Sequence, residues 1–281
     1  MRDTGQRRPR SFYFLLALFV VYMAFLYGPM LCVFILSFQG PTGGMSFPMV
    51  GVSLHWFEVL FGGAGGQGVG DMHNSFVRSM RMAAIVAELT MMIAVSAGMA
   101  YRRKFPGSDF VFYASIASIV MPGIFVGFGI ALAFNLLGLE VQWFSSGIGE
   151  QLTWSLPFGL LIMFIILGRF NPSYEEAATD LGATSWQRFR EVILPIILPG
   201  VIGIFMAGFT SSYEESARTS LNVGTGNTMP MEITGLLTSA TSPVLFAVGT
   251  VTTLFSFALV IATLLITVGI AKRRQMRLSA H

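Results

Sequence analysis

Glutamates within or beside long apolar segments are the residues of this chain best placed to do chemistry. Glu88 falls inside an apolar run. Tyr213, Glu214 and Glu215 stand together at the end of another. A charged side chain at the bilayer centre costs at least ~2.5 kcal/mol, so such groups usually face a cavity or a partner. They could attract a cation along a transport path or relay protons. Each has a structural alternative to these functional roles. Glu88 could hydrogen-bond to a partner subunit, and Glu214 and Glu215 could lie in water or pair with Arg218.

The sequence carries no motif of a hydrolase or of a metal site. Neither of its two lysines, Lys104 and Lys272, follows a Gly-rich phosphate-binding loop. The three histidines are scattered, no H-E-x-x-H occurs, and Cys32 is the sole cysteine, which excludes a disulfide framework. We therefore expect a chain that is not an enzyme and holds no metal or cofactor. Any ATP hydrolysis must come from another polypeptide.

The composition is that of an all-α membrane protein. The chain is 54% hydrophobic and only 11% charged, whereas soluble proteins have about 25% charged residues. A membrane-spanning helix needs about 20 mostly apolar residues. Six segments meet this requirement, at residues 12–38, 76–101, 110–137, 152–168, 192–213 and 244–271. Pro122 is expected to kink the third of them, and the glycines that follow it favour close helix approach.

The positions of Lys and Arg predict the orientation. Fourteen of the 17 lie in residues 1–11, in the second-to-third and fourth-to-fifth connections, or in residues 272–281. Because cytoplasmic loops carry such an excess, both termini are predicted to be cytoplasmic, flanking a transmembrane domain at 12–271. Basic residues at membrane edges suit contact with lipid and give no reason to expect nucleic acid.

A polar segment at residues 174–190 interrupts this apolar pattern. Asn171 and Ser173 are candidate N-caps, and Glu175 and Glu176 suit the positive end of a helix dipole. Apolar residues at i, i+4 and i+5 predict one amphipathic helix, in which Gly182 allows a bend or a close approach. On the cytoplasmic side this helix would offer a docking surface. The alternative is an interfacial helix that lies on the membrane.

The segment also carries a specific spacing. Glu-Ala-Ala is followed after three residues by Gly, and after nine more by Val-Ile-Leu-Pro. This resembles the EAA-x3-G-x9-I-x-LP signature of permease subunits of ABC importers, with Val192 in place of its Ile. The residues that match or stand at its positions are Glu176, Ala177, Ala178, Gly182, Val192, Leu194 and Pro195.

The resemblance implies a type I ABC importer permease fold (MetI-like) in the cell inner membrane. It implies that residues 174–190 are a coupling helix seated on a cytoplasmic ATPase dimer. Further implied partners are a second permease, expected to be a homologous different chain, and an external solute-binding protein. ATP-driven closure would move the coupling helix and open the permease outward, and solute would enter between the two permeases.

A second resemblance concerns the solute. The Ser-Tyr-Glu-Glu stretch, the Gly-rich segment 222–226 and Met229-Pro230 are similar to a pattern in polyamine permeases of this superfamily, although Ser216 replaces the usual aromatic. This implies spermidine, putrescine or a related organic cation or amino-acid derivative. Iron(III), thiamine and sulfate importers share the architecture and stay open as alternatives. From another class, a proton-coupled secondary carrier would use Glu88 and Glu214 as relay groups, but no inverted repeat supports it.

Overall fold

The computed structural model of the chain describes residues 9–62, 72–103, 105–239 and 242–278. Within these ranges the regular elements are helices, accompanied by one isolated bridge between Gln39 and Val52. The all-α class predicted from the sequence is therefore confirmed. Lys104, residues 1–8 of the predicted N-terminal tail and the last three residues of the C-terminal tail lie outside the described residues.

The chain divides into two compact units, of which the first comprises residues 1–70 and 235–255. It holds α1 (Arg10–Leu36), α2 (His55–Phe61) and the first part of α11 (Val244–Leu278). The apolar window of α1 is uncovered along its whole length, as suits a helix in contact with lipid or another chain. After α1, the buried amide of Gln39 holds the loop by donating to the Gly44 carbonyl at 2.9 Å.

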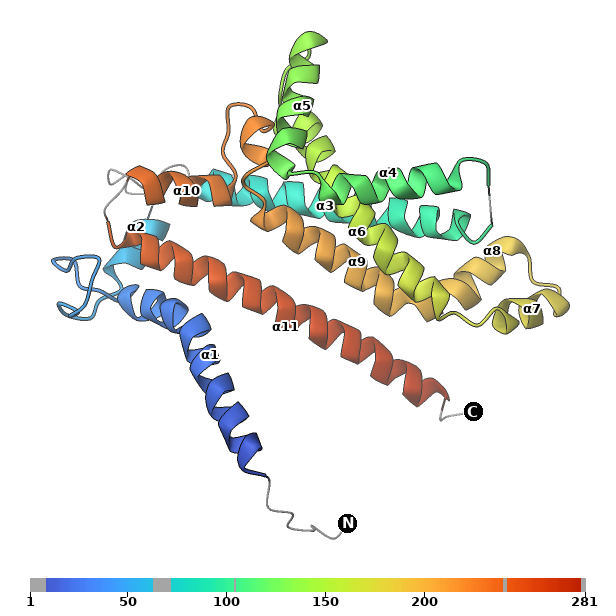
Figure 1. The fold of residues 1–281 in the computed structure, drawn as a ribbon, viewed down its shortest axis with the longest axis horizontal. Coiled ribbons are helices and arrows are strands. Elements are labelled where there is room, and N and C mark those ends of the chain that lie inside the picture. The colour runs from blue at the N-terminus through green and yellow to red at the C-terminus, as the bar shows by residue number, and fades with distance from the viewer. Residues whose placement is uncertain (1–8, 63–71, 104, 240–241, 279–281) are drawn as a thin grey trace. The chain divides into compact units, whose positions relative to one another are not determined.

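The second unit, residues 71–234 and 256–281, is built on three long helices that lie side by side. These are α3 (Met72–Ala100), α6 (Ile148–Gly168) and α9 (Leu194–Glu214), shown in Figure 1. Their shared core is apolar and consists of Ala94, Met163, Phe170, Ile193, Ile197, Val201 and Ile204.

Small residues set the spacing of the three helices. A Cβ at Gly159 of α6 would lie 2.9 Å from the Thr90 methyl and 3.1 Å from the Ala94 methyl, both on α3. A Cβ at Gly208 of α9 would lie 3.2 Å from the α3 backbone at Ala87. Close backbone approach of this kind is how membrane helices gain packing contacts without a hydrophobic driving force.

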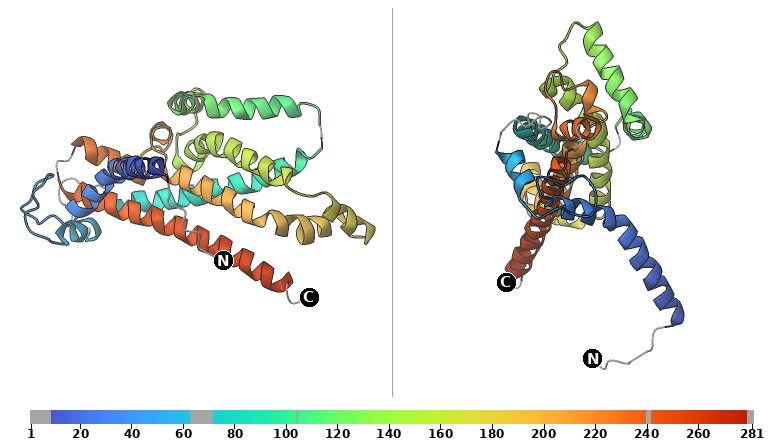
Figure 2. Two further views of the ribbon diagram at one scale, coloured as in Figure 1. Left: turned by 60° about the horizontal axis from the view of Figure 1, so that its bottom comes forward. Right: turned by 90° about the vertical axis from the view of Figure 1, so that its left-hand side faces the viewer.

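The third predicted span is not one straight helix. It consists of α4 (Ser108–Val120) and α5 (Gly123–Leu136), which meet at 109°. Both views in Figure 2, like Figure 1, show α5 turned away from the line of α4. Met121 is extended because the ring of Pro122 disfavours a helical conformation in the residue before it. The expected kink is therefore a complete break.

The other predicted spans match long helices. Among the residues that the structure describes, five helices are long and apolar enough to cross a membrane, and the bent pair raises the number to six if it forms one span. The fourth span begins earlier than predicted, at the π-helical turn η1 (Trp143–Gly147) rather than at residue 152. Sequence hydropathy misplaced this boundary because Glu150 and Gln151 read as loop residues, yet both are buried in α6. The last helix continues to Leu278, into the predicted tail.

Short elements occupy the two ends of the bundle. At one end, between α6 and α9, lie α7 (Ser173–Asp180), α8 (Ser185–Gln187) and the π-helical turn η2 (Arg188–Ile193). At the other end of α9 come η3 (Thr219–Leu221) and α10 (Met229–Ser239). The Met229 amide donates to the Ser79 hydroxyl at 2.8 Å and so fastens the start of α10 to α3.

Candidate functional site: a helix–turn–helix loop and a groove in the bundle

The predicted helix at 174–190 is two short helices separated by a turn. The Ser173 amide donates to the Asn171 side chain at 3.1 Å and opens α7, with Glu175 and Glu176 in its first turn. α7 ends at Asp180, and the chain turns before α8 begins at Ser185. The expectation of a single continuous helix is therefore wrong. The expected N-caps are wrong too, because Pro172 holds the N-cap position without a side-chain cap and Ser173 is already helical, whereas the acidic first turn is confirmed.

Gly182 explains the break. Its φ is +80°, in the left-handed region that glycine adopts without strain. The Gly182 amide donates to the Thr179 carbonyl at 2.9 Å, and the Ala183 amide donates to the Ala178 carbonyl at 3.0 Å. These two bonds form a Schellman motif, a common way of ending a helix at glycine. Because open space surrounds a Cβ built at Gly182, the glycine serves backbone conformation in this chain rather than close packing.

The second helix has its own start signal. The Thr184 hydroxyl accepts from the Gln187 amide at 3.3 Å, and the Gln187 side chain accepts from the Thr184 amide at 2.8 Å. This reciprocal pair is a capping box. The sequence Thr-Ser-Trp-Gln displays the signature, so the second helix start could have been found before the structure.

The residues of the EAA-type motif are divided between two environments. Glu176 and Ala177 are exposed, and Ala178 is half-buried. Val192 and Leu194 are half-buried where η2 passes into α9, and Pro195 is exposed in the first turn of α9. A proline at this point cannot donate to the carbonyl four residues earlier, which suits the wide π turn before it.

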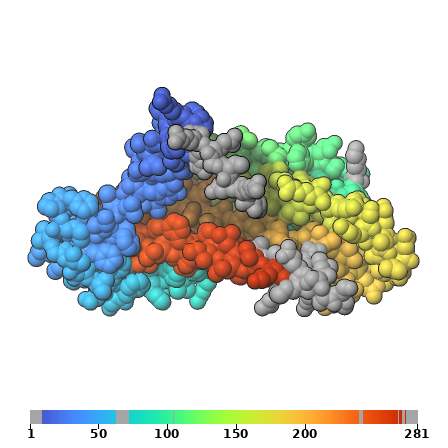
Figure 3. Space-filling view, turned by 90° about the horizontal axis from the view of Figure 1, so that it is seen from below, coloured from blue at the N-terminus to red at the C-terminus, as the bar shows by residue number. Residues whose placement is uncertain are grey.

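The loop presents an uncovered apolar surface. Leu181 is 89% exposed and Trp186 is 65% exposed, on either side of the Gly182 turn. In the space-filling view, the yellow atoms of α7 and α8 lie open at the surface (Figure 3). Isolated large apolar residues are common on surfaces, but two that flank one rigid turn are suited to a partner protein.

The same loop is tied firmly to the bundle. The Arg102 guanidinium, just after α3, lies 2.6 Å from the Glu175 carboxylate and stacks over the Phe170 ring at 5.5 Å. Phe170 and Ile193, which flank the loop on both sides, belong to the core shared by α3, α6 and α9. A displacement of α7 and α8 is therefore transmitted to the bundle through packed side chains. Sequence reasoning read Arg102 only as a topology anchor.

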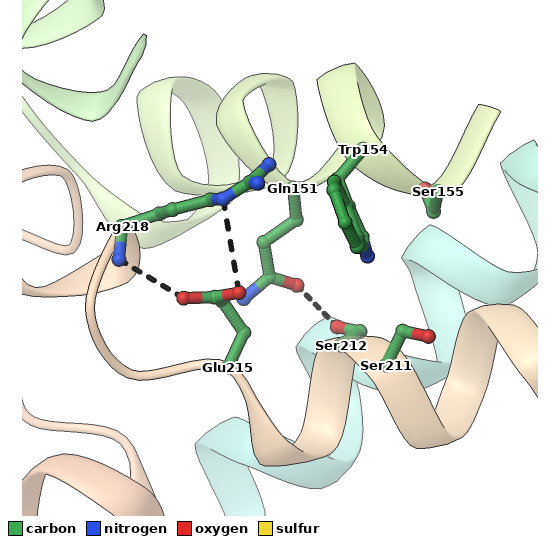
Figure 4. Close-up of a pocket in the computed structure, with 7 residues that line it drawn as sticks. All are labelled: Gln151, Trp154, Ser155, Ser211, Ser212, Glu215 and Arg218. Atoms are coloured by element: carbon green, nitrogen blue, oxygen red, sulfur yellow. Dashed lines mark hydrogen bonds and ion pairs between the residues drawn. The ribbon is translucent and has the colours of Figure 1, made fainter. Parts of the chain in front are cut away.

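A groove lies between α6 and α9 at the opposite end from α7 and α8. Its narrow polar part is lined by Gln151, Trp154, Ser155, Ser211, Ser212, Glu215 and Arg218 (Figure 4). It adjoins a larger apolar part, whose lining includes Phe158, Ile162 and Ile204 and which shares Trp154, Ser155 and Ser211. The groove therefore combines a charged end with an apolar trough.

Hydrogen bonds fix the polar walls. The Ser212 hydroxyl donates to the Gln151 carbonyl oxygen, and the Gln151 amide donates to the Thr219 hydroxyl at 3.0 Å. The Thr90 hydroxyl donates to that of Ser155 at 2.8 Å. Sequence reasoning missed Gln151 and Trp154, and it considered Arg218 only as a partner of the neighbouring glutamates. Polar side chains within an apolar stretch were the available signal for Gln151, but no local pattern places Arg218 against Trp154 of α6.

The Tyr213–Glu215 stretch is split by the structure. Glu215 lines the groove, where it accepts the Arg218 amide at 3.0 Å and lies 3.9 Å from the Arg218 Nε. Glu214 is exposed and lies outside the groove lining. Tyr213 is buried, with its ring stacked on Phe209 at 6.4 Å. The pairing with Arg218 holds for Glu215 alone.

Glu88 lies away from this groove. It is exposed on α3, whereas Ala87 and Thr90 face the neighbouring helices. An exposed Glu88 is compatible with both sequence interpretations, a place on a path between two permeases and a hydrogen bond to the partner subunit. As for ion binding, no cluster of three His, Cys, Asp or Glu side chains suited to a metal occurs among residues 9–62, 72–103, 105–239 and 242–278.

Comparisons with known proteins agree with this architecture. Residues 90–274 match the family of binding-protein-dependent transport system inner membrane components. The chain is 28% identical over 252 residues to the spermidine/putrescine transport system permease protein PotC of Haemophilus influenzae, covering 89% of this chain and 94% of that protein. It is also 28% identical over 234 residues to the putrescine transport system permease protein PotI of Escherichia coli, covering 80% of each.

A solved structure resembles the fold. A chain in the crystal structure of a bacterial alginate ABC transporter, in complex with a pentasaccharide-bound periplasmic protein, superposes with a TM-score of 0.64. The sequence identity is 16%, and the match covers 90% of this chain and 92% of that one. The family match extends over more than half of the sequence and includes the loop, the groove and α9. The chain therefore belongs to the inner-membrane components of binding-protein-dependent transport systems and is a permease of an ABC importer.

Proposed function

We propose that this permease carries a polyamine such as spermidine or putrescine, or a related organic cation or amino-acid derivative. The groove between α6 and α9 is the observation that supports this most directly. The Glu215 carboxylate and the face of Trp154 suit an ammonium group, because carboxylates and aromatic faces both attract cations. The trough lined by Phe158, Ile162 and Ile204 suits a methylene chain. The names of the PotC and PotI relatives give the same class of solute.

The α7–turn–α8 loop is, on this proposal, the docking site of a separate ATPase dimer. Exposed Leu181 and Trp186 would enter the ATPase surface, and the contact would extend over Glu176 and Ala177. The packed connection through Ile193 and Leu194 would carry nucleotide-driven movement into α9. Coupling between distant sites requires an element with two arrangements. On this proposal that element is α9, and its movement would change access to the groove.

The arrangement in the membrane follows from the same assignment. The α7–α8 end and both termini would be cytoplasmic, as the basic residues predict. A second, homologous permease would cover exposed faces of this chain, including Glu88, and a solute-binding protein would deliver cargo from outside. No cofactor is proposed for this chain. Family membership argues against the proton-coupled carrier, since such carriers need no ATPase partner.

An uptake experiment tests the solute assignment. The complete transporter in proteoliposomes, with its binding protein, is given radiolabelled spermidine, putrescine, thiamine, sulfate or iron(III). ATP-dependent uptake of the two polyamines alone supports the proposal, whereas uptake of one of the other solutes in their place contradicts it. The Glu215→Gln variant should raise the KM about tenfold, equivalent to about 1.4 kcal/mol. Its matched control is Glu214→Gln, because Glu214 lies outside the groove lining.

The partner assignment has a separate test. Affinity purification of the intact transporter should recover a tightly bound ATPase in a 2:2 ratio with the two permeases (about one ATPase per permease chain), as alternating access by a nucleotide-driven dimer requires. A transporter that takes up solute with ATP but contains no such subunit would contradict the docking role of α7 and α8.

A further inference from the structure

Arg218 occupies the position in the groove that is chemically best suited to a cation. Its guanidinium carbon lies 4.4 Å from the centroid of the Trp154 ring. Its Nε faces the Glu215 carboxylate at 3.9 Å, as Figure 4 shows. The Arg218 guanidinium thus already occupies the aromatic face and the carboxylate that would bind a solute ammonium.

The surroundings of this charge compensate it incompletely. Arg218 is only 7% exposed, and its Nη1 is buried without a hydrogen-bond partner in the part of the chain that the structure describes. The 3.9 Å separation of Nε from Glu215 is an ion pair but exceeds hydrogen-bond length. A buried ion whose hydrogen bonds are unmade is costly to hold in place. These unmade hydrogen bonds lower the cost of replacing the guanidinium with another cation.

Hydrogen bonds hold the backbone on the C-terminal side of Arg218, so its side chain can move while the backbone stays in place. The neighbouring Thr219 hydroxyl accepts from Gln151 at 3.0 Å, and the Asn222 side chain donates to the Gly127 carbonyl at 3.0 Å. The guanidinium rests against Gly123 at the start of α5, where a Cβ would collide with it. Gly123 thus leaves the space that the arginine stem needs in order to reach Trp154.

A second acidic residue is buried near the same point. The Glu150 carboxylate is fully buried and interacts with the charges of Glu215 and Arg218. Neither of its oxygens accepts a hydrogen bond of good geometry from a described residue. The groove lining therefore pairs one carboxylate, Glu215, with one guanidinium, while the buried Glu150 carboxyl lies outside the lining and interacts with Thr219 as well. A compact ammonium group can approach the Glu215 carboxylate to hydrogen-bond distance, whereas the Arg218 Nε stays 3.9 Å from it.

We propose that Arg218 is a tethered occupant of the ammonium subsite formed by Trp154 and Glu215, and that a solute ammonium must displace it to enter the groove. This rests on the proposed polyamine function and names the residue that controls access to the subsite. With Arg218 in place, solutes without a competing cation are excluded. Displacement of the guanidinium frees the face of Trp154, which lines both the polar part of the groove and the apolar trough.

Competition of this kind predicts a tighter apparent affinity when the competitor is removed. If the guanidinium holds the subsite for about nine-tenths of the time, the apparent dissociation constant is about tenfold above its intrinsic value. A role of Arg218 in binding the solute, or in purely structural pairing with Glu215, predicts the opposite, since its loss would then raise the KM or leave it unchanged.

The test measures ATP-dependent putrescine uptake by the complete transporter in proteoliposomes, with full saturation curves. Arg218→Gln should lower the KM about tenfold. Arg218→Lys retains a tethered cation and should restore the KM toward that of the wild type. The matched control is Arg78→Gln, because Arg78 also bonds an end-of-bundle loop, through the Asn227 carbonyl at 2.7 Å, but lies outside the groove lining. Its KM should equal that of the wild type.

A second variant keeps the inference testable if Arg218→Gln fails to assemble. Gly123→Ala places a methyl group against the guanidinium and should push it off Trp154, lowering the KM with the charge still present. An unchanged or raised KM in either assembled variant overturns the inference while the proposed polyamine function stands. Absence of polyamine uptake by the wild-type transporter overturns both.

Discussion

Arg102 and Glu175 meet at 2.6 Å and join the end of α3 to the first turn of α7. Both side chains are about a quarter exposed, and Arg102 also stacks on Phe170. The contact thus connects the candidate docking loop to a second helix of the bundle, in addition to its covalent links to α6 and α9. The ion pair is a local fastening of the loop, and its strength can be measured.

A double-mutant cycle on this pair should give a coupling energy of about 0.5–1 kcal/mol, the upper part of the range for partly exposed ion pairs. Arg102→Ala, Glu175→Ala and the double variant are compared by thermal unfolding of the purified transporter. Arg103→Ala serves as the control, since Arg103 is exposed beside Arg102 and makes no ion pair with a described residue. Strict additivity of the two single changes would show that the pair contributes nothing.

Gly182 should tolerate asparagine better than alanine. Its φ of +80° costs an ordinary L-residue roughly 1–2 kcal/mol, and asparagine less. Since no atom lies within 4 Å of a Cβ at this position, the loss in the isolated permease reflects backbone strain alone. Thermal unfolding measures it.

Gly182→Trp separates that strain from docking. In the isolated permease it should cost about as much as alanine, about 1–2 kcal/mol. In the complete transporter the bulky side chain would stand at the ATPase contact, and uptake should be lost while the permease remains inserted. Full uptake by this variant would show that Gly182 does not lie at the ATPase contact.

Leu181→Glu and Trp186→Glu should release the ATPase without harming the fold. Both side chains are largely exposed and flank the Gly182 turn, so a charge there costs the permease little but would be buried unpaired in the complex, at several kcal/mol. Co-purification of the ATPase provides the measurement. Leu139→Glu is the matched control, since Leu139 is an exposed leucine outside the α7–α8 loop. Retention of the ATPase by both loop variants would place its docking surface elsewhere.

Gly159→Val should destabilise the bundle by about 1–3 kcal/mol through overpacking. Already a Cβ there lies 2.9 Å from Thr90 and 3.1 Å from Ala94 on α3. Gly203→Val is the matched control, because it makes the same change within α9, where no atom lies within 4 Å of the new Cβ. Thermal unfolding of both variants isolates the packing contribution. Equal stability of the two would mean that the helices can separate to accept the larger side chain.

Much of the fold could be predicted because the relevant signals are local. An apolar run long enough to cross a bilayer predicts its own helix, and five of the six predicted spans match long apolar helices. The spacing from Glu176 to Pro195 lies within one stretch of chain and indicates the importer family without any tertiary information. The break at Pro122 also had a local cause, but no local pattern predicts the angle between α4 and α5.

The groove could not be predicted in this way. The Ser212–Gln151 bond joins residues 61 positions apart, and the Arg218–Trp154 contact likewise brings a loop against a different helix. Glu150 and Glu88 are both glutamates in or next to apolar runs, yet one is completely buried and the other exposed. Which side of a helix faces its neighbours depends on packing, here on where Gly159 and Gly208 allow α3 to approach.

The sequence by itself determined the helical class, the segregation of charge and the motif that identifies the permease family, since hydropathy, charge and spacing are properties of neighbouring residues. Only the tertiary structure decided that residues 174–190 turn at Gly182, that α4 and α5 part at 109°, and that Arg218 lies on Trp154 beside Glu215. These features arise from backbone conformation and from contacts between distant segments. The energies of these features depend on burial and on contact residues distant in sequence, which a local sequence pattern does not predict.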